Sequence, residues 1–122
     1  MDNADHNIYL KHIQEAIDKI ERYIDGLNYE QFSKNDMAID AVVRELEIIG
    51  EAATKVSDQF QEANPNIPWT SMIGMRNQLI HGYFAVDTRV VWQTCNRDLM
   101  ELKSLLSDSI YIGLVQREWH AV

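Results

Sequence analysis

The sequence predicts an all-α fold, a single antiparallel bundle of four main helices. Apolar residues recur three and four positions apart along most of the 122 residues, which is the spacing of one helix face. Only five glycines and two prolines interrupt the chain, and both prolines lie in one short segment. The length suits one domain with a core of its own. We expect residues 8–106 to hold this core and residues 107–122 to extend the last helix or form a tail.

The first two predicted helices carry long apolar stripes. Leu10, Ile13, Ile17, Ile20, Ile24 and Leu27 form the first stripe. Gly26 provides a stop, residues 28–35 form a connection with one short turn, and Asn35 or Asp36 caps the second helix. The second stripe consists of Ile39, Val42, Leu46, Ile49, Ala53, Val56 and Phe60. Because Gly50 lets another helix approach closely and the apolar surface is wide, this helix is predicted to have neighbours on several sides, including a second subunit.

Two more helices follow a break at residues 61–68. Pro65 and Pro68 disfavour helix at the residues before them, and Pro68 suits the first position of a new helix. This third helix is predicted to span about residues 69–82 and to bury Trp69, Met72, Ile73, Leu79 and Ile80. Asp87 or Thr88 then caps a fourth helix. The buried stripe of that helix is Val91, Cys95, Leu99, Leu102 and Leu106.

Charge, cysteine content and apolar runs argue against a general nucleic-acid-binding protein, a disulfide-bonded protein and a membrane protein. The formal net charge of −8 disfavours general binding to long nucleic acids, although a local positive pocket remains compatible with it. Cys95 is the single cysteine, so no internal disulfide can form. The chain shows no charged-then-apolar leader and no apolar run of about 18 residues. We therefore expect a cytoplasmic protein with no membrane segment.

The most reactive set of side chains lies on the third predicted helix. Arg76, Asn77, His81 and Tyr83 fall within eight residues of one another. Asn77 and His81 share a face, whereas Arg76 and His81 are about 140° apart on a helix that turns about 100° per residue. The long arginine side chain, a distortion near Gly82 or a second copy across a dimer axis would each bring them to one pocket.

These residue types suit the cleavage of RNA through its own 2′-hydroxyl. His81 can accept or donate a proton near neutral pH. Arg76 presents a planar, permanently charged fork that matches phosphate oxygens, and Asn77 can orient either the imidazole or the substrate. A zinc site would need three or four ligands, and none stands beside His81. We therefore expect neither a metal nor another cofactor.

A purely structural interpretation accounts for the same residues. One arginine and one histidine on an exposed helix face are common, and Tyr83 would then be a packing aromatic. Glu47 and Glu51 would be a pair on a solvated helix face. Asp40 and Arg44, also four residues apart, would form a surface ion pair.

Several stretches resemble one protein family. The run Arg76-Asn77-x-x-x-His81-Gly82-Tyr83 is similar to the Arg-x4-His-x-Tyr signature of HEPN-domain ribonuclease toxins of the HepT branch. The sequences VRELEIIGEA at residues 43–52, IPW at residues 67–69 and FAVD at residues 84–87 resemble the same branch. Together these stretches extend the resemblance over roughly residues 10–106.

The resemblance implies an all-α HEPN-like bundle that forms a homodimer around a shared cleft. Arg76 and His81 would be the catalytic pair of a metal-independent endoribonuclease, with Asn77 in support. Tyr83 would be adenylylated by a partner nucleotidyltransferase antitoxin of the MntA type. This modification would silence the toxin of a type VII toxin–antitoxin system, because phosphate charge and bulk beside the cleft exclude RNA.

The sequence is compatible with two other functions. A non-catalytic HEPN partner of a nucleotidyltransferase would bind nucleotide or substrate at the same cleft, and the acidic charge favours this alternative. A dimeric structural module would need none of the polar residues. The complete Arg76, His81 and Tyr83 set favours the ribonuclease.

Overall fold

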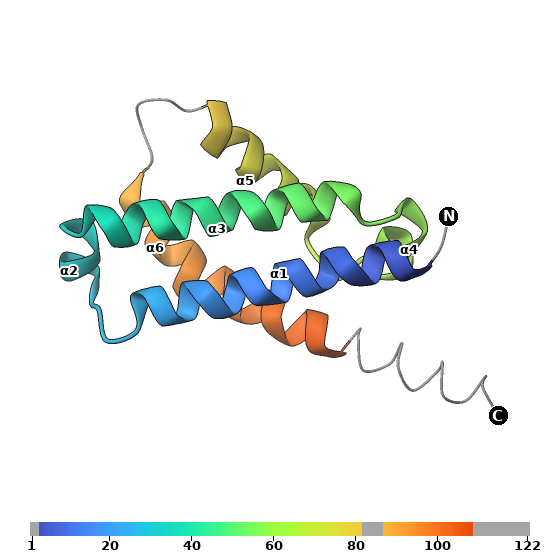
Figure 1. Ribbon diagram of the computed structural model, residues 1–122, viewed down its shortest axis with the longest axis horizontal. Helices are drawn as coiled ribbons and strands as arrows, with labels where there is room; N and C mark the ends of the chain where they lie inside the picture. The colour runs from blue at the N-terminus through green and yellow to red at the C-terminus, as the bar shows by residue number, and fades with distance from the viewer. Residues whose placement is uncertain (1–2, 82–86, 109–122) are drawn as a thin grey trace.

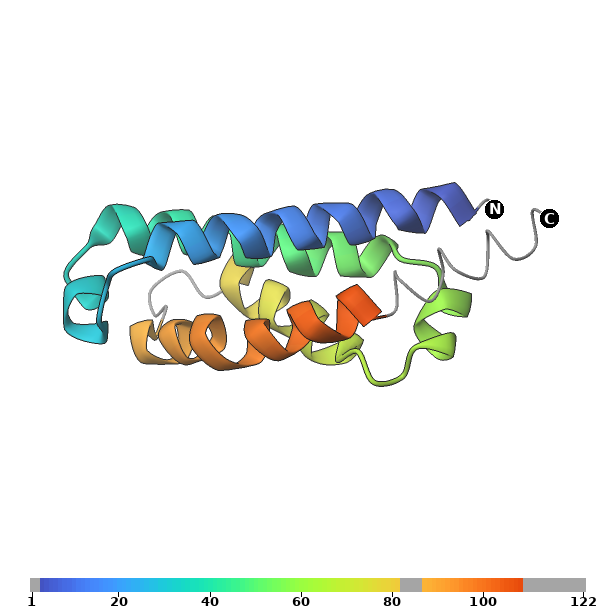
Figure 2. The same ribbon diagram turned by 90° about the horizontal axis from the view of Figure 1, so that it is seen from below.

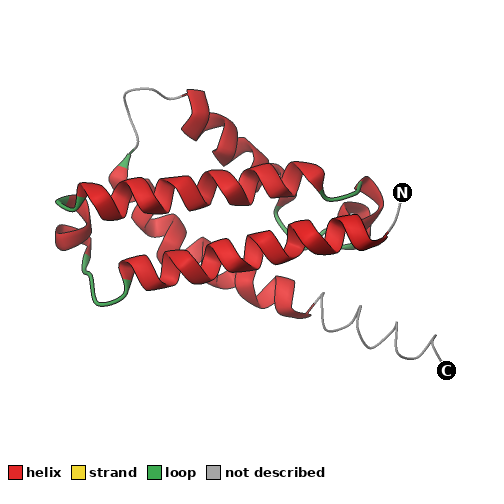
Figure 3. Ribbon diagram, viewed as in Figure 1, coloured by secondary structure: helices red, strands yellow, loops and turns green. Residues whose placement is uncertain are grey.

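A computed structural model describes residues 3–81 and 87–108, and every regular element within these ranges is a helix (Figure 3). Helices α1 (Asn3–Ile24) and α3 (Asp36–Lys55) lie side by side and run in opposite directions (Figure 1). Gly26 follows α1 with a φ of 78°, a conformation that glycine adopts without strain and that ends the helix there. The all-α prediction is confirmed, whereas the homodimer stays a prediction.

The second half of the chain crosses beneath this pair. α4 (Asp58–Ala63) leads through the two prolines into α5 (Trp69–His81), which packs mainly on α3. The last helix starts with α6 (Thr88–Gln93), continues through the π-helical turn η1 (Thr94–Asp98) and runs on through residues 99–108. Figure 2 shows it on the opposite side of the bundle from α1 and α3. Residues 3–81 and 87–108 thus contain four main helices, as predicted, with two short ones between them.

The core consists of the stripes that the sequence predicts. Almost all of the predicted stripe positions in α1, α3 and the last helix are enclosed, and Leu46 and Ile49 of α3 are fully buried. Trp69 and Met72 of α5 are buried as well, and Ile73 and Leu79 are partly buried against them. Removing this apolar surface from water is the main term that stabilises the bundle.

The predicted continuation of the second helix to Phe60 is wrong. α3 ends at Lys55, and Val56 turns into extended backbone with ψ of 135°. The Ser57 hydroxyl then accepts a hydrogen bond from the Phe60 N–H at 3.2 Å and starts α4 as its N-cap. The Gln61 amide donates to the carbonyl oxygens of Ala53 and Val56 at 3.2 and 3.0 Å, which satisfies the open end of α3. The apolar spacing survives the break because both helices cover the same core.

Three smaller predictions also need correction. Ile80 was expected in the core but is 40% exposed, because α5 leans away from α3 and its C-terminal end projects beyond the rest of the bundle in Figure 1. Arg44 pairs with Glu47 at 3.6 Å and not with Asp40. Pro68, which suits the first helical position, instead immediately precedes the third helix, and its carbonyl oxygen accepts the Met72 N–H at 3.0 Å. The helix itself starts at Trp69, as predicted.

The predicted connection at residues 28–35 contains a short helix, α2 (Tyr29–Ser33). Asn28 and Gln31 each bond the other's backbone N–H, at 2.8 and 3.0 Å, which is a complete capping box. This helix buries Phe32 under Trp92 of α6, with the ring centroids 5.1 Å apart. α2 therefore ties the turn between α1 and α3 to the start of the last helix.

The last helix contains one wide turn, η1. There the Leu99 N–H bonds the Thr94 carbonyl oxygen, five residues back, so the turn takes up one extra residue. Val91 and Cys95 before this turn and Leu99, Leu102 and Leu106 after it are all buried.

Candidate active site

Arg76 lies on α5 where this helix packs closely against Gly50 of α3. A Cβ atom at Gly50 would lie 2.8 Å from the Met72 carbonyl oxygen and 2.9 Å from Arg76 Cγ, with Arg76 Cβ nearer still. Only a glycine therefore allows α5 to rest here. The close approach that the sequence predicts for Gly50 is confirmed, and its partner is the helix that carries the arginine.

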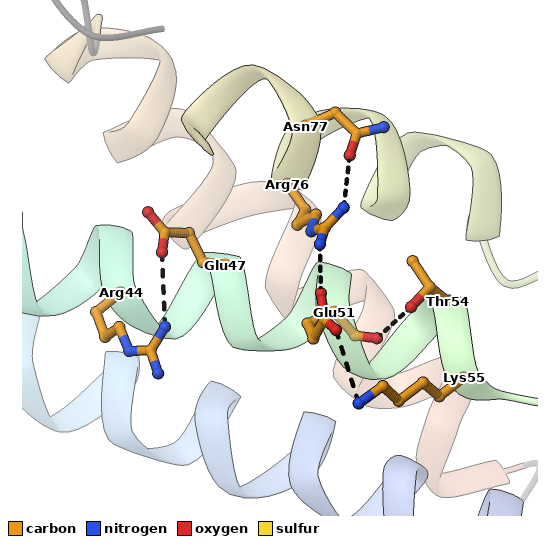
Figure 4. Close-up of polar contacts among 7 residues, drawn as sticks. All are labelled: Arg44, Glu47, Glu51, Thr54, Lys55, Arg76 and Asn77. Atoms are coloured by element: carbon orange, nitrogen blue, oxygen red, sulfur yellow. Dashed lines mark hydrogen bonds and ion pairs between the residues drawn. The ribbon is translucent and has the colours of Figure 1, made fainter. Parts of the chain in front are cut away.

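Two acceptors hold the guanidinium of Arg76. Arg76 Nη2 donates to Glu51 Oε2 on α3 at 2.6 Å, and Nη1 donates to Asn77 Oδ1 at 2.9 Å. Figure 4 shows the guanidinium between these two side chains, with Glu51 on the α3 side. The Nε atom is enclosed and has no hydrogen-bond partner among the described residues. Both terminal nitrogens are thus fixed by neighbours from two helices.

The charge of Glu51 is shared with a second cation. Lys55 Nζ lies 3.7 Å from Glu51 Oε1, whereas Arg76 binds Oε2. Lys55 also lies 5.8 Å from the centre of the Tyr9 ring on α1, a distance at which the ring attracts a cation. One carboxylate thus stands between two permanent cations, so the group of three keeps one net positive charge.

The described residues bring together two of the four predicted site residues, Arg76 and Asn77. His81 is the last residue of α5, and its side chain lies outside the described part of the structure. Tyr83 lies outside the described residues altogether. On α5 the backbone positions of Arg76 and His81 keep the angular separation of about 140° expected of a regular helix.

Glu51 is the functional candidate that the sequence interpretation missed. It was assigned with Glu47 to a solvated face, because pairs four residues apart on a helix usually are surface pairs. The structure separates the two residues, since Glu47 pairs with Arg44 whereas Glu51 reaches Arg76. The position of Glu51 directly after the close-approach glycine is the signal that could have identified it.

A cleft of about 620 Å³ lies between α5 and the last helix, away from Arg76. Among its lining residues are Met72, Met75 and Gln78 of α5 and Val90, Asp98 and Leu102 of the last helix. Its walls are largely apolar, and Glu101 adds a second carboxylate to Asp98. The phosphates of RNA bind to Lys and Arg side chains, so this cleft does not suit RNA. The seam between α3 and α5, where Arg76 and Lys55 share Glu51, carries a net positive charge and suits RNA better.

The described part of the chain offers few other side chains that could react or bind a metal ion. Burial raises the pKa of the Cys95 thiol to about 12, so it is a neutral core group at physiological pH. Within residues 3–81 and 87–108, no three His, Cys, Asp or Glu side chains gather in a way that would hold a metal ion. Nor does any helix there combine the length and apolarity needed to cross a membrane.

Comparison with known proteins identifies the family. A family model described as ribonuclease HepT-like matches residues 13–108. The chain is 44% identical over 98 residues to "Probable ribonuclease HepT" of Thermococcus cleftensis, spanning 80% of this chain and 89% of that protein. It is 36% identical over 100 residues to an inferred RNase of Caldanaerobacter subterraneus, with coverage of 82% and 89%. An inferred RNase of Methanocaldococcus jannaschii is 37% identical over 103 residues, with coverage of 84% and 94%.

No solved structure matches the chain significantly. The family model and the relatives agree with one another, and both cover most of the chain. The resemblance deduced from the motifs is thereby confirmed. The chain belongs to the HepT-like ribonuclease family.

Proposed function

We propose that the protein is a metal-independent endoribonuclease and the toxin of a type VII toxin–antitoxin system. The observation that carries this proposal is the arrangement on α5 in a member of a ribonuclease family. Arg76 is fixed at the α3–α5 seam, Asn77 binds it, and His81 ends the same helix. A cation for phosphate and a group that titrates near neutral pH thus lie on one helix.

The cleavage step follows from these two residues. His81 takes the proton from the 2′-hydroxyl of the ribose, whose oxygen then attacks the adjacent phosphorus. The bond from phosphorus to the 5′-oxygen breaks, which leaves a 2′,3′-cyclic phosphate. The leaving oxygen receives a proton from water, and His81 returns its own proton to the solvent. Arg76 faces the negative charge that gathers on the phosphate oxygens during the attack, which is where a fixed cation lowers the barrier.

Two subunits complete the site in this proposal. The positions of Arg76 and His81 lie about 140° apart on a regular helix, so a cleft shared by two copies of α5 joins them more readily than one helix face does. The projecting C-terminal end of α5 supports this arrangement, since Ile80 there is 40% exposed (Figure 1). A partner nucleotidyltransferase adenylylates Tyr83 and thereby excludes RNA from the cleft.

The test is RNA cleavage without added metal by purified protein and its variants. We expect His81→Ala to lower kcat by about 100-fold or more, since a general acid–base residue contributes at least that factor. His12→Ala is the matched control, because His12 is an exposed histidine on α1 and should not affect cleavage. Tyr83→Phe should cleave normally and resist silencing by a nucleotidyltransferase with ATP.

Mixing two inactive variants tests the shared cleft. A heterodimer of Arg76→Ala and His81→Ala subunits contains one intact Arg–His pair only if the pair spans the two subunits. Activity should therefore return on mixing, and a mixture that stays inactive would contradict the shared site. Equal cleavage by His81→Ala and wild type would contradict the assignment itself. A wild type that binds nucleotide or nucleotidyltransferase but never cleaves RNA would favour the non-catalytic partner, which the net charge of −8 also suits.

A further inference from the structure

The guanidinium of Arg76 is held by one residue of another helix and one of its own helix. Glu51 on α3 accepts from Nη2 at 2.6 Å, a short distance typical of a charge-assisted bond. Asn77 accepts from Nη1 at 2.9 Å. A guanidinium is planar, so two acceptors at its two terminal nitrogens define the plane in which its other N–H groups lie.

Each terminal nitrogen of Arg76 carries two N–H groups, and the two bonds above use one from each. One N–H thus remains on Nη1 and one on Nη2, in a plane that the two acceptors set. Recognition of a phosphate uses such a pair of N–H groups from one guanidinium. The orientation of that pair depends on Glu51, because Asn77 is exposed and is the sequence neighbour of Arg76 on the same helix.

Glu51 can orient the arginine without cancelling its charge. Lys55 lies 3.7 Å from the second oxygen of Glu51, so two cations share one carboxylate. The side chains of Arg76 and Glu51 are 30% and 45% exposed, and ion pairs at such sites contribute little to stability. Losing this bond should therefore leave the fold intact and change the rate of RNA cleavage.

We propose that Glu51 is a positioning residue for Arg76, which aims the free N–H groups of the guanidinium at the phosphate during cleavage. This inference rests on the proposed ribonuclease function. Glu51 acts through Arg76 and has no contact with substrate of its own. Because the aim matters most when charge develops on the phosphate, its loss lowers kcat more than it raises KM.

The experiment compares cleavage of one RNA by wild type, Glu51→Ala, Glu51→Gln and Glu47→Ala. We expect Glu51→Ala to lower kcat by about 10- to 100-fold with KM changed less than about threefold, since small misplacements of a catalytic group have effects of this size. Glu51→Gln keeps an acceptor oxygen without the charge and should show an intermediate loss. Glu47 lies one turn earlier on α3 and binds Arg44, so Glu47→Ala should behave as wild type.

A second background separates positioning from a general structural effect. In Arg76→Lys, which keeps a cation but lacks the planar fork, Glu51→Ala should cause a smaller loss than in wild type, because the two effects are coupled. Equal losses in both backgrounds would overturn the inference, as would an unchanged kcat in Glu51→Ala beside an active wild type. An unfolded Glu51→Ala, judged by circular dichroism, would leave the decision to Glu51→Gln, for which wild-type kcat counts against the inference. An inactive wild type would instead refute the ribonuclease proposal, and this inference with it.

Discussion

Gly50 is the residue on which the location of Arg76 depends. The backbone of α5 rests where a side chain at position 50 would stand, and one of the atoms in the way is the Met72 carbonyl oxygen, which cannot rotate aside. Gly50 and Glu51 are neighbours in sequence, so the position that lets α5 approach and the carboxylate that binds its arginine come from one turn of α3. A change at Gly50 thus affects both packing and the site.

Gly50→Ala should destabilise the protein. Forcing a methyl group into this contact costs about 1–3 kcal/mol, which outweighs the gain of up to about 1 kcal/mol that alanine brings to a helix interior. Urea unfolding monitored by circular dichroism would measure the change, and RNA cleavage should fall as α5 shifts. Gly74→Ala on α5 is the matched control, since no described atom lies within 4 Å of its added Cβ, and it should be neutral or stabilising. A Gly50→Ala protein as stable as wild type would contradict the close contact.

At this scale the sequence predicts the types of site residues better than their contacts. Arg76 and Asn77 could be chosen because their chemistry suits phosphate, and they do bind each other. The bond from Arg76 to Glu51 could not be deduced, because it joins residues 25 positions apart on different helices. Periodicity reports which face of a helix a residue occupies, and it does not report which residue of a neighbouring helix stands opposite.

The helices themselves follow from local rules wherever capping and apolar spacing agree. Asn35 was predicted as a cap and does accept the Ala38 N–H at 3.0 Å. The break between α3 and α4 could not be deduced from spacing, since Phe60 keeps the apolar period across it. A serine cap at Ser57 and the reach of Gln61 back to Ala53 end α3. The serine cap is a local signal that apolar spacing does not report, whereas the bond from Gln61 joins residues eight positions apart across the break.

The turn η1 predicts an unusual tolerance to shortening. If Asn96 is deleted, the Thr94 carbonyl oxygen lies four residues from the Leu99 N–H in sequence, and an ordinary α-helical bond can replace the wide one. Leu99, Leu102 and Leu106 would keep their places in the core. We therefore expect the Asn96 deletion to retain most of the free energy of unfolding, as measured by chemical denaturation.

Deleting Met100 is the control for this prediction. Met100 is exposed, like Asn96, but it follows the wide turn. Its loss would rotate Leu102 and Leu106 by about 100° and take them from the core. Since each large apolar side chain lost from a core costs about 2–5 kcal/mol, this variant should be severely destabilised. Equal stability of the two deletions would show that η1 does not absorb the loss of a residue.

The molecule as a whole is closed by a polar link between its first and last helices. Lys103 Nζ binds both carboxylate oxygens of Glu21 at 3.0 and 3.1 Å, and Asp18 lies 3.8 Å away. The hydrogen bond to Glu21 and the charge of that residue raise the pKa of Lys103 above its ordinary value of 10.5. The folded protein thus holds the Lys103 proton more tightly than the unfolded chain does.

This raised pKa predicts how stability depends on pH. The contribution of Lys103 is fully present below its unfolded pKa of 10.5 and is lost as the pH rises through the higher folded value. Lys103→Met should therefore be less stable than wild type at pH 8 to 10, and the difference should shrink above that range. Thermal unfolding of both proteins across this pH range is the measurement. A difference that stays constant at high pH would contradict the link.

The overall architecture was the most predictable level. Four main helices in an antiparallel bundle follow from apolar spacing alone, since each stripe needs a partner that covers it. The family resemblance also held, because its motifs are short-range patterns that survive in a single sequence. The homodimer and the cleft between subunits depend on contacts between two chains. Apolar spacing within one chain does not report these contacts.

The distances along the chain between bonded residues also bear on the order in which the protein folds. Glu51 and Arg76 are 25 positions apart, whereas Glu21 and Lys103 are 82 apart. Contacts between nearby positions form before contacts that close long loops. During synthesis on the ribosome, α3 and α5 are therefore available to meet while the last helix is still being made. The bond between Arg76 and Glu51 would then form before the bundle around it is complete.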